Sequence, residues 1–205
     1  MKILFPAAVL YNQKKPLKLV NLSFSQKLDK AQVLVKIIKT GICGAQIGEI
    51  EGVKGEDKWL PHCLGHEGYG IVVAKHPSVK KVKIGNEVIM HWKKGSGNNS
   101  NYPSYFHDGK KINAGAITTF QKYAVVSENR VTKVVLDNNL KKIAPLFGCV
   151  ISTAYGIIKN DISFDKSNKF LIFGAGGVGV CLALLLYSSG VKKKNIFLID
   201  KNSKK

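Results

Sequence analysis

The 205-residue chain has almost no arginine and few acidic residues. Arg130 is the one arginine among 32 basic residues, which face 13 aspartates and glutamates and give a formal net charge of +19. Proteins that read a nucleic-acid sequence usually use arginine forks and clustered basic stripes. The lysines are instead scattered, in part as short pairs such as Lys80-Lys81. The charge therefore predicts a lysine-rich solvated surface and no specific nucleic-acid partner.

A secretory signal and a long hydrophobic run are also lacking. The N-terminal apolar stretch is short, contains Pro6, and is not followed by a small-residue cleavage site. The longest apolar run, residues 170–187, contains four glycines, which argues against a membrane span. We therefore expect a cytoplasmic protein with no membrane partner, whose four cysteines stay reduced.

The rest of the composition is typical of a globular protein. Hydrophobic residues make up 45% of the chain and charged residues 22%, which excludes a disordered or fibrous protein. The region 1–150 is rich in short β-branched runs separated by glycine, asparagine, serine and proline, which predicts a mainly β region. The expected elements are strands at 31–39, 70–74, 87–90, 120–126 and 131–136, a helical turn at 45–51, and a loop at 95–101.

The C-terminal part of the chain follows a different pattern. An apolar strand is predicted at 169–173, a helix at 178–187 and a second apolar strand at 195–199, with Gly190 as the helix stop. This order predicts the first β-α-β unit of a parallel sheet that is buried on both faces. Two parallel strands do not form a stable domain of this class alone. We therefore expect the chain to be a fragment or to take further strands from elsewhere.

A glycine-rich turn joins the first of these strands to the helix. Gly174, Gly176 and Gly179 fit the G-x-G-x-x-G pattern, and Asp200 ends the second strand 200 − 179 = 21 residues later. In this context the glycines allow a tight turn, close approach of a pyrophosphate and close packing of helix on strand. Asp200 would accept hydrogen bonds from ribose hydroxyls, which favours NAD over NADP, although Lys201 leaves that choice open. The alternative is a turn that merely connects two elements.

Candidate metal ligands are dispersed along the chain. The sequence has neither a C-x-x-C pair nor an H-E-x-x-H motif, and Cys43, His66 and Cys149 belong to three widely separated segments. Three ligands from distant segments, with one open position, are typical of catalytic zinc. Cysteines are, however, more often small core residues. The spacing alone leaves both interpretations open.

Several longer motifs occur along nearly the whole chain. They are GICG (41–44), PHCLGHEGYG (61–70), VKIGNEV (82–88), TTFQKYAVV (118–126), FGCVISTAYG (147–156) and the glycine turn (174–179). In this order they resemble the zinc-dependent medium-chain dehydrogenases, the alcohol dehydrogenase superfamily. The resemblance implies an α/β plus β chain: a GroES-like, partly open β-barrel catalytic domain over residues 1–150, then the start of an NAD-binding Rossmann domain over residues 151–205, with only its first β-α-β unit.

The same resemblance implies roles for individual residues. Cys43, His66 and Cys149 would be the ligands of one catalytic zinc, and Glu67 would act beside the ligand histidine. Read without the resemblance, Glu67 would be a surface carboxylate, Thr153 a helix N-cap and Val178 a core residue. The cofactor-binding residues implied are Thr153 and Val178 at the nicotinamide, Gly174, Gly176, Gly177 and Gly179 in the turn, and Asp200 at the ribose. His62, His91, Cys63 and Cys181 match no ligand position and are predicted to be ordinary polar or core residues.

The chain also departs from the family's pattern. Ala45 stands where alcohol dehydrogenases carry the serine or threonine of a proton relay, and Gln46 replaces the usual aspartate or histidine. The loop at 91–111 has no cysteine, so we expect no structural zinc. Its aromatic residues, Trp92, Tyr102, Tyr105 and Phe106, would pack the lobe or line a substrate cleft.

These features together predict an oxidoreductase that uses one zinc ion and NAD. It would transfer a hydride between the cofactor and a small alcohol, polyol, aldehyde or ketone, with a lean towards hydroxylated substrates, and the intact protein would be a homo-oligomer. The alternative is a truncated, catalytically inactive member of the family, or a binding module that keeps part of the fold.

Overall fold

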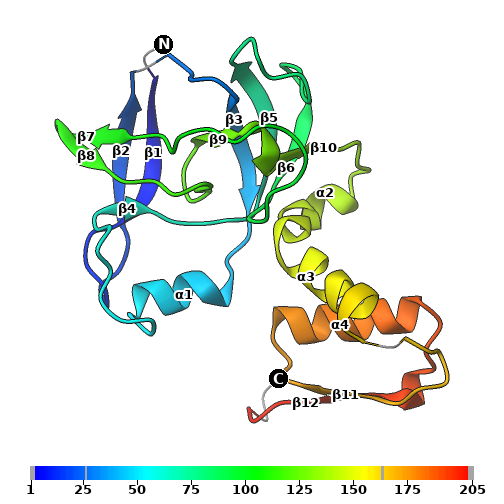
Figure 1. Ribbon diagram of the computed structural model, residues 1–205. Helices are drawn as coiled ribbons and strands as arrows, with labels where there is room; N and C mark the ends of the chain where they lie inside the picture. The colour runs from blue at the N-terminus through cyan, green and yellow to red at the C-terminus, as the bar shows by residue number, and fades with distance from the viewer. Residues whose placement is uncertain (1–2, 26, 163, 203–205) are drawn as a thin grey trace. The chain divides into compact units, whose positions relative to one another are not determined.

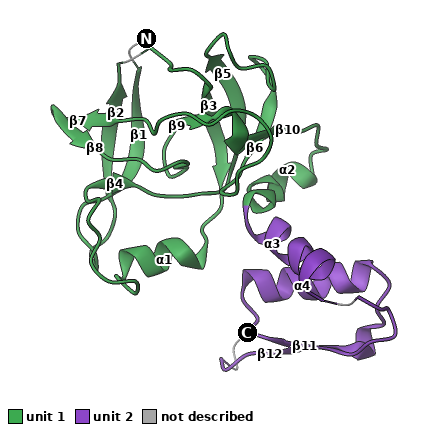
Figure 2. Cartoon of the chain, in the orientation of Figure 1, with its two compact units in different colours: residues 1–148 green, residues 149–205 purple. Residues whose placement is uncertain are grey.

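The structure is a computed structural model that describes residues 3–25, 27–162 and 164–202. The chain divides into two compact units, Met1–Gly148 and Cys149–Lys205 (Figure 2). In the described part of the first unit, ten strands form two five-stranded sheets, whereas the second unit has one two-stranded sheet (Figure 1). The mainly β character predicted for the region 1–150 is confirmed.

The first sheet is built from strands that lie far apart in the sequence. Its strand order is β4-β1-β2-β7-β8, and every neighbouring pair is antiparallel. Most of its strands are too short to be predicted from residue pattern, and none of the five was predicted. They are β1 (Ile3–Leu10), β2 (Lys18–Phe24), β4 (His62–Cys63), β7 (Tyr105–His107) and β8 (Lys110–Ile112).

The second sheet contains the strands that were predicted. Its order is β10-β6-β5-β3-β9, again antiparallel throughout. The backbone N–H of Ala8 in β1 donates to the carbonyl of Phe120, 2.8 Å away, so the two sheets meet and curl towards a barrel. The strands are β3 (Gln32–Thr40), β5 (Gly68–Lys75), β6 (Glu87–Met90), β9 (Tyr123–Ser127) and β10 (Val131–Lys133). Strand β10 is shorter than the predicted strand at 131–136.

An aromatic cluster fills the core of the first sheet. Phe5 and Phe24 pack edge-on against the fully buried ring of Tyr105. The Tyr105 hydroxyl accepts hydrogen bonds from the backbone N–H of Val125 (2.9 Å) and the side-chain amide of Gln121 (3.1 Å). Burial raises the pKa of this phenol well above its ordinary value. Tyr105 therefore packs the core and does not line a cleft.

Short helical segments complete the first unit. The predicted helical turn is confirmed as α1 (Gly44–Ile50), which directly follows Cys43. A second short helix, α2 (Leu140–Ile143), leads into a 3-10 turn at Ala144–Gly148, where the unit ends.

The second unit contains the predicted β-α-β order. Strands β11 (Phe170–Phe173) and β12 (Ile196–Ile199) pair in parallel, and α4 (Gly177–Ser188) connects them. Gly190 follows the helix with a φ of +96°, as expected of a helix stop. The unit begins with α3 (Val150–Gly156), whose N-cap is Cys149, so the alternative interpretation of Thr153 as a helix N-cap is wrong.

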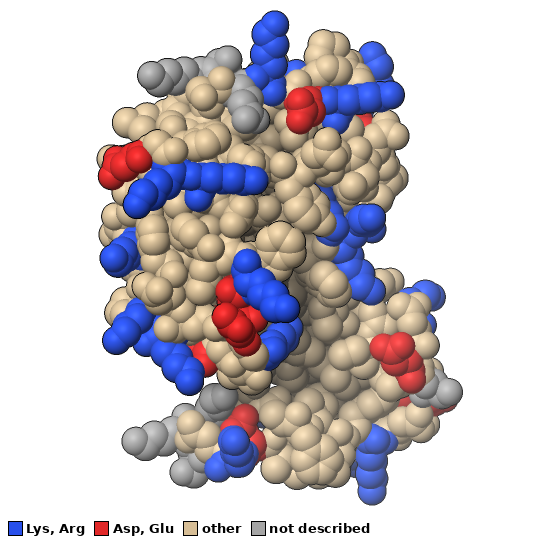
Figure 3. Space-filling view, turned by 60° about the vertical axis from the view of Figure 1, so that its left-hand side comes forward, with Lys and Arg blue, Asp and Glu red and all other residues tan. Residues whose placement is uncertain are grey.

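The distribution of lysines and the length of the apolar helices bear on the possible partners of the chain. On the face drawn in Figure 3 the lysines stand singly or in small groups rather than in a continuous basic band. Within the described ranges, no single helix is both long and apolar enough to cross a bilayer, and the helical segments Leu140–Gly148 and Val150–Asp161 reach that length and composition only as a bent pair.

Candidate metal centre and dinucleotide turn

Two cysteines and one histidine from distant segments come together in the structure. Cys43, His66 and Cys149 each offer one ligand atom, and these atoms all lie within 4.8 Å of one another. Ligand sulfurs around a tetrahedral zinc ion are about 3.8 Å apart. All three residues are partly buried, and no other group of this kind occurs among the described residues. The geometry favours the metal interpretation over three unrelated core residues.

The Cys43 side of this centre is held by the start of α1. Cys43 is the N-cap residue of α1, and its carbonyl accepts the N–H of Gln46 at 3.0 Å. The side-chain oxygen of Gln46 lies 3.3 Å from the backbone N–H of Cys43 and accepts from it. The first turn of the helix therefore fixes the backbone that carries the thiol.

His66 is held by a turn between β4 and β5. Gly65 has a φ of +91°, and a β-carbon there would collide with Thr119. The carbonyl of Leu64 accepts from the N–H groups of both Thr119 (2.9 Å) and Phe120 (3.0 Å). The motif around Thr119 thus serves as the anchor of the histidine turn.

The surroundings of the His66 ring favour its neutral form, which is the form that can bind a metal. Burial lowers its pKa, which favours the neutral ring that metals bind. Its Nε2 atom is buried and has no hydrogen-bond partner among the described residues. The other ring nitrogen, Nδ1, contacts the side-chain amide of Gln46, which is 3% exposed. The atom that faces Nδ1 is the amide nitrogen of Gln46; a half-turn of the amide, which moves its oxygen from the Cys43 N–H to the ring, would let Gln46 accept the Nδ1 proton of the tautomer that binds a metal through Nε2.

Cys149 follows a glycine that is packed tightly in the first unit. A β-carbon at Gly148 would collide with the carbonyl of Met90 and with the side chain of Glu67. The carbonyl of Gly148 also accepts from the N–H of Trp92 at 3.4 Å. The division between the units falls at the peptide bond between Gly148 and Cys149, so the backbone of Cys149 begins directly at this tightly packed glycine.

Glu67 lies inside the protein, so its interpretation as a surface carboxylate is wrong. The residue is 2% exposed, and a β-carbon at Gly41 would collide with its carboxylate. Its carbonyl accepts from the N–H of Gly41 (3.3 Å) and the hydroxyl of Thr40 (3.1 Å). Glu67 is thereby held against the segment that leads to Cys43.

The remaining cysteines and two further histidines have structural surroundings. Burial raises the pKa of Cys63 to about 12 and raises that of Cys181, so both keep their protons. His62 contacts Asp57 at 2.7 Å, and His91 contacts the carbonyl of Lys93 and the hydroxyl of Thr132. Their predicted status as ordinary core or polar residues agrees with these contacts.

The glycine turn of the second unit has the geometry that the motif predicts. Gly174 adopts a φ of +104°, and a β-carbon at Gly179 would collide with the carbonyl of Gly174. Gly176 is the N-cap of α4, and open space surrounds the position of its missing β-carbon. The turn therefore leaves the helix start accessible to a phosphate group.

Asp200 lies beside this turn. Its Oδ2 atom accepts from the backbone N–H of Ala175 at 2.8 Å, and its Oδ1 atom accepts from Asn202 at 2.8 Å. A carboxylate next to the glycine turn can accept hydrogen bonds from the hydroxyl groups of a ribose. Val178, with 38% of its surface exposed, stands in the first turn of the same helix.

A family model described as the alcohol dehydrogenase GroES-like domain matches residues 29–136, which is more than half of the chain. The chain belongs to the alcohol dehydrogenase family. The resemblance seen in the motifs is thereby confirmed, and so is the fold class, a GroES-like barrel followed by the start of a Rossmann fold.

Related proteins match nearly the whole chain. It is 29% identical to an S-(hydroxymethyl)glutathione dehydrogenase of Photobacterium damsela subsp. piscicida and 27% identical to one of Escherichia coli. Each alignment covers 97% of this chain and 59% of the relative. The chain thus spans about three fifths of the length of these curated relatives.

Solved structures of alcohol dehydrogenases have the same fold. The chain superposes on a zinc-binding-domain alcohol dehydrogenase of Burkholderia ambifaria with a TM-score of 0.86, at 23% identity, over 100% of this chain and 60% of that one. It superposes on the benzyl alcohol dehydrogenase of Acinetobacter calcoaceticus with a TM-score of 0.77, at 26% identity, over 97% and 58%.

Sequence reasoning missed the part that Gln46 plays. It noted Gln46 only as a replacement, whereas the structure brings its side chain to both Cys43 and His66. The available signal was its place three residues after a ligand cysteine at a helix start, where side chains commonly bond back to the cap residue.

Proposed function

We propose that this chain is the metal-binding part, and the beginning of the dinucleotide-binding part, of a zinc-dependent oxidoreductase. The enzyme would transfer a hydride between NAD and an alcohol, polyol, aldehyde or ketone. The observation that carries the proposal is that one ligand atom each of Cys43, His66 and Cys149 lies within 4.8 Å of the others, while the buried Nε2 of His66 has no hydrogen-bond partner in the described part of the chain. Residues 1–150 would form the catalytic domain and residues 151–205 the start of the NAD-binding domain.

The donor set suits zinc. Two sulfurs and one imidazole nitrogen are ligands that zinc accepts, and three protein ligands leave one position for a substrate. When bound, the metal supplies Lewis-acid polarisation of a substrate oxygen. Cys43, His66 and Cys149 would hold the ion, Gln46 would orient the histidine, and Glu67 would lie behind the ligands as a buried carboxylate. One catalytic zinc and no structural zinc are proposed.

The second unit would hold the cofactor, whose nicotinamide accepts or donates the hydride. Gly174, Gly176, Gly177 and Gly179 would let the pyrophosphate approach the start of α4, with Thr153 and Val178 at the nicotinamide. Asp200 would accept hydrogen bonds from the ribose hydroxyls while it keeps its bond to the turn. Its negative charge disfavours a 2′-phosphate, which supports NAD over NADP.

The substrate proposal rests on a missing hydroxyl. Ala45 follows Cys43 by two residues and has no proton to pass, so a proton would leave by another route. The names of the relatives suggest alcohols attached to larger groups, such as the glutathione adduct and benzyl alcohol. We propose a hydroxylated small molecule as the substrate, and a cytoplasmic, homo-oligomeric protein.

The same departure favours a second candidate, a family member that keeps the metal centre but does not turn over substrate. Both candidates predict a bound metal, so the metal does not distinguish them. Absorbance of NADH at 340 nm during incubation with alcohols does, since only the enzyme produces it.

The test of the metal centre is metal analysis of the purified chain with matched variants. We expect about one zinc per chain, and a thiolate-to-metal charge-transfer band near 340 nm after Co²⁺ substitution. Cys43→Ser and Cys149→Ser should lose the band, while Cys63→Ser and Cys181→Ser should keep it. A chain that binds no zinc, or keeps it in the first two variants, would refute the proposal.

A further inference from the structure

The first unit contains a cavity that none of the three metal-ligand candidates lines. Its volume is about 760 Å³, within the range of small-molecule sites. It is lined by residues near the end of α1, by the loop that leads to β4, and by the segments on either side of β7 and β8. All of these lie in the first unit.

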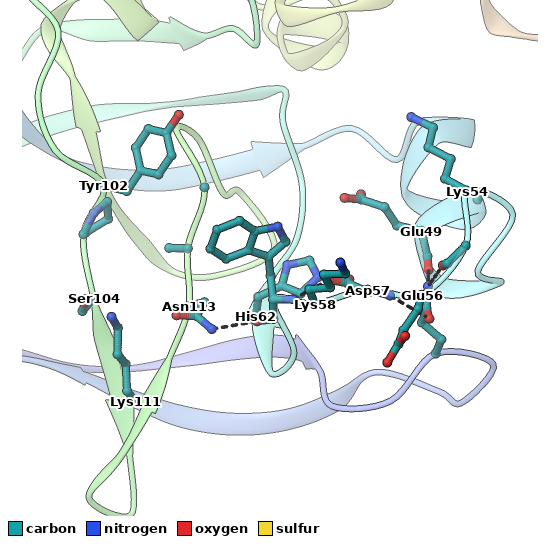
Figure 4. Close-up of a pocket in the computed structure, with 17 residues that line it drawn as sticks. Glu49, Lys54, Glu56, Asp57, Lys58, His62, Tyr102, Ser104, Lys111 and Asn113 are labelled. Carbon is teal, nitrogen blue, oxygen red and sulfur yellow. Dashed lines mark hydrogen bonds and ion pairs between the residues drawn. The ribbon is translucent and has the colours of Figure 1, made fainter.

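The cavity has two walls that carry different polar groups. Figure 4 shows Tyr102, Ser104 and Lys111 on one side, and Glu49 and Lys54 on the other. The carboxylate of Glu49 points from its wall into the space between them (Figure 4). A ligand in this space would therefore meet an aromatic ring, ammonium groups and a carboxylate at once.

Two aromatic side chains at the cavity are left largely to solvent. Trp59 is 72% exposed and Tyr102 is 60% exposed, although both line the cavity. Large aromatic faces offer much apolar contact area, and their burial by a ligand is favourable. These two rings provide flat surfaces on which a ring-shaped ligand can stack.

The charges of the cavity are mixed, and most of them are not paired with one another. Within the described ranges, the structure records no ion pair for the two carboxylates, Glu49 and Glu56, or for the three lysines, Lys54, Lys58 and Lys111. A third carboxylate, that of Asp57, contacts His62 at 2.7 Å. Donors and acceptors are thus both available, with little net charge to attract an ion.

This combination selects among ligand classes. Hydroxyl groups can donate to carboxylates and accept from ammonium groups, so a polyhydroxylated ring satisfies both kinds of side chain. A purely aromatic alcohol would cover the same charges without satisfying them, which is costly. A strongly charged ligand would meet repulsion from one of the two sets.

The loop that carries Trp59 is held in place without a ligand. The side-chain amide of Gln13 donates to the carbonyl of Gly55 at 2.9 Å, and its oxygen accepts from the N–H of Asp57 at 3.1 Å. Asn113 donates to the carbonyl of Trp59 at 2.7 Å, and the Asp57 carboxylate accepts the N–H of Trp59 at 2.8 Å. A preformed site loses less entropy on binding.

We propose that this cavity binds a neutral carbohydrate, with a sugar ring stacked on Trp59 and Tyr102 and its hydroxyls bonded to Glu49 and the lysines. The proposal goes beyond the redox function, because it requires neither the metal nor NAD. Its failure and the failure of the metal proposal are therefore separate outcomes.

The test uses the two tryptophans of the chain, Trp59 and Trp92, as NMR probes. Each gives one indole N–H signal in a ¹⁵N-labelled sample, and Trp92→Phe assigns the pair. Titration with D-glucose and with maltose should shift the Trp59 signal saturably and leave the Trp92 signal in place. The result should be the same with and without added zinc.

Variants and competing ligands decide the ligand class. Trp59→Ala and Glu49→Gln should each weaken maltose binding at least about five-fold, measured by the concentration dependence of backbone amide shifts. Tyr187→Ala, which removes a tyrosine that is 61% exposed outside the cavity, should bind as the unmodified chain does. The spread of amide signals verifies that each variant is folded.

Three outcomes would overturn the proposal. They are the absence of a saturable shift with either sugar, tighter binding of benzyl alcohol or glucose 6-phosphate than of glucose, and unchanged sugar binding in both Trp59→Ala and Glu49→Gln.

Discussion

The two units bury their apolar side chains to different extents. The first unit curls two antiparallel sheets around its own core, in which Phe5 and Phe24 are at most 2% exposed. The second unit has a parallel pair of strands and one helix, and it leaves Phe173 77% exposed and Leu184 63% exposed. Parallel sheets are normally covered on both faces. The comparison shows that a β-α-β unit needs more partners than a curled antiparallel sheet does.

The core of the second unit is correspondingly small. Its fully or nearly buried apolar residues are Ile172, Leu186 and Val191. Its helix α4 is apolar on every side, as expected of a helix that is surrounded by protein. The free energy of folding in this chain therefore resides chiefly in the first unit.

Truncation of one core side chain in each unit should give the largest change in stability, and the change should stay within that unit. Phe5→Ala removes a ring that packs on Tyr105 and Tyr123, and should lower the free energy of unfolding of the first unit by about 3–5 kcal/mol. Leu186→Ala should increase hydrogen exchange only in the second unit. Hydrogen exchange followed by mass spectrometry measures both. Equal loss of protection in both units after either change would show that the chain unfolds as one body.

Removal of a buried carboxylate should have the next largest effect, again confined to the first unit. Glu128 is 4% exposed and accepts from the N–H groups of Lys80 (2.7 Å), Lys81 (2.8 Å) and Asn98 (3.1 Å). Glu128→Gln weakens these charge-assisted bonds and should cost about 1.5–3 kcal/mol, measured by urea unfolding at pH 7.

The same residue predicts a dependence of stability on pH. Burial alone would raise the pKa of Glu128, but its backbone N–H donors hold the pKa below the ordinary value of 4.5. Its stabilising contribution is therefore complete above pH 4.5 and is lost as the pH falls through the folded-state value. Glu128→Gln should make the free energy of unfolding depend less on pH between pH 6 and pH 3, as measured by urea unfolding at each pH. Equal slopes for both proteins would contradict this account.

A smaller effect is expected at the metal centre, where it tests the Gln46 contact. Gln46→Ala removes the side chain that orients His66 and should weaken zinc affinity about 10–100-fold, measured by competition with a chromophoric chelator. Gln46→Asp offers a carboxylate that can accept the Nδ1 proton and should restore most of the affinity. Unchanged affinity in Gln46→Ala would show that the amide does not position the ligand.

Part of this architecture follows from local sequence, and part does not. The second sheet and the β-α-β unit were predictable because β3, β5 and β6 are β-branched or apolar runs and the glycine turn has a fixed spacing. The first sheet was not, because β1 contains Pro6 and because β7, which pairs with β2, is three residues long. The pairing of Ser23 with Phe106 joins two distant segments of the chain, and local propensity does not encode such pairing.

The candidate site divides in the same way. Spacing left Cys43, His66 and Cys149 as three separate residues, and only the family resemblance brought them together before the structure did. The turn at Gly65 and the anchor at Thr119 explain why: the ligands are placed by contacts between segments that are distant in the sequence. The sequence pointed to the cavity near Trp59 only through Tyr102, whose loop was expected to pack the lobe or line a cleft, because the walls of the cavity come from four separate segments.

The smallest expected change in folding stability concerns the exposed face of α4. Val180, Leu184 and Tyr187 follow helical spacing and are 41%, 63% and 61% exposed, so they form one apolar stripe. Leu19 in β2 is 84% exposed, and it lies between the exposed Lys18 and the partly buried Val20, opposite Ala8 of β1. Leu184→Lys and Leu19→Lys should each change the free energy of unfolding by less than about 0.5 kcal/mol.

Self-association is expected to separate these two variants. Contiguous apolar patches promote association, whereas single exposed leucines do not. Leu184→Lys should therefore reduce any concentration-dependent increase in sedimentation coefficient, while Leu19→Lys should leave it unchanged. If the two variants sediment alike, the exposed stripe on α4 does not drive association, and the contrast between the units is confined to how each one folds.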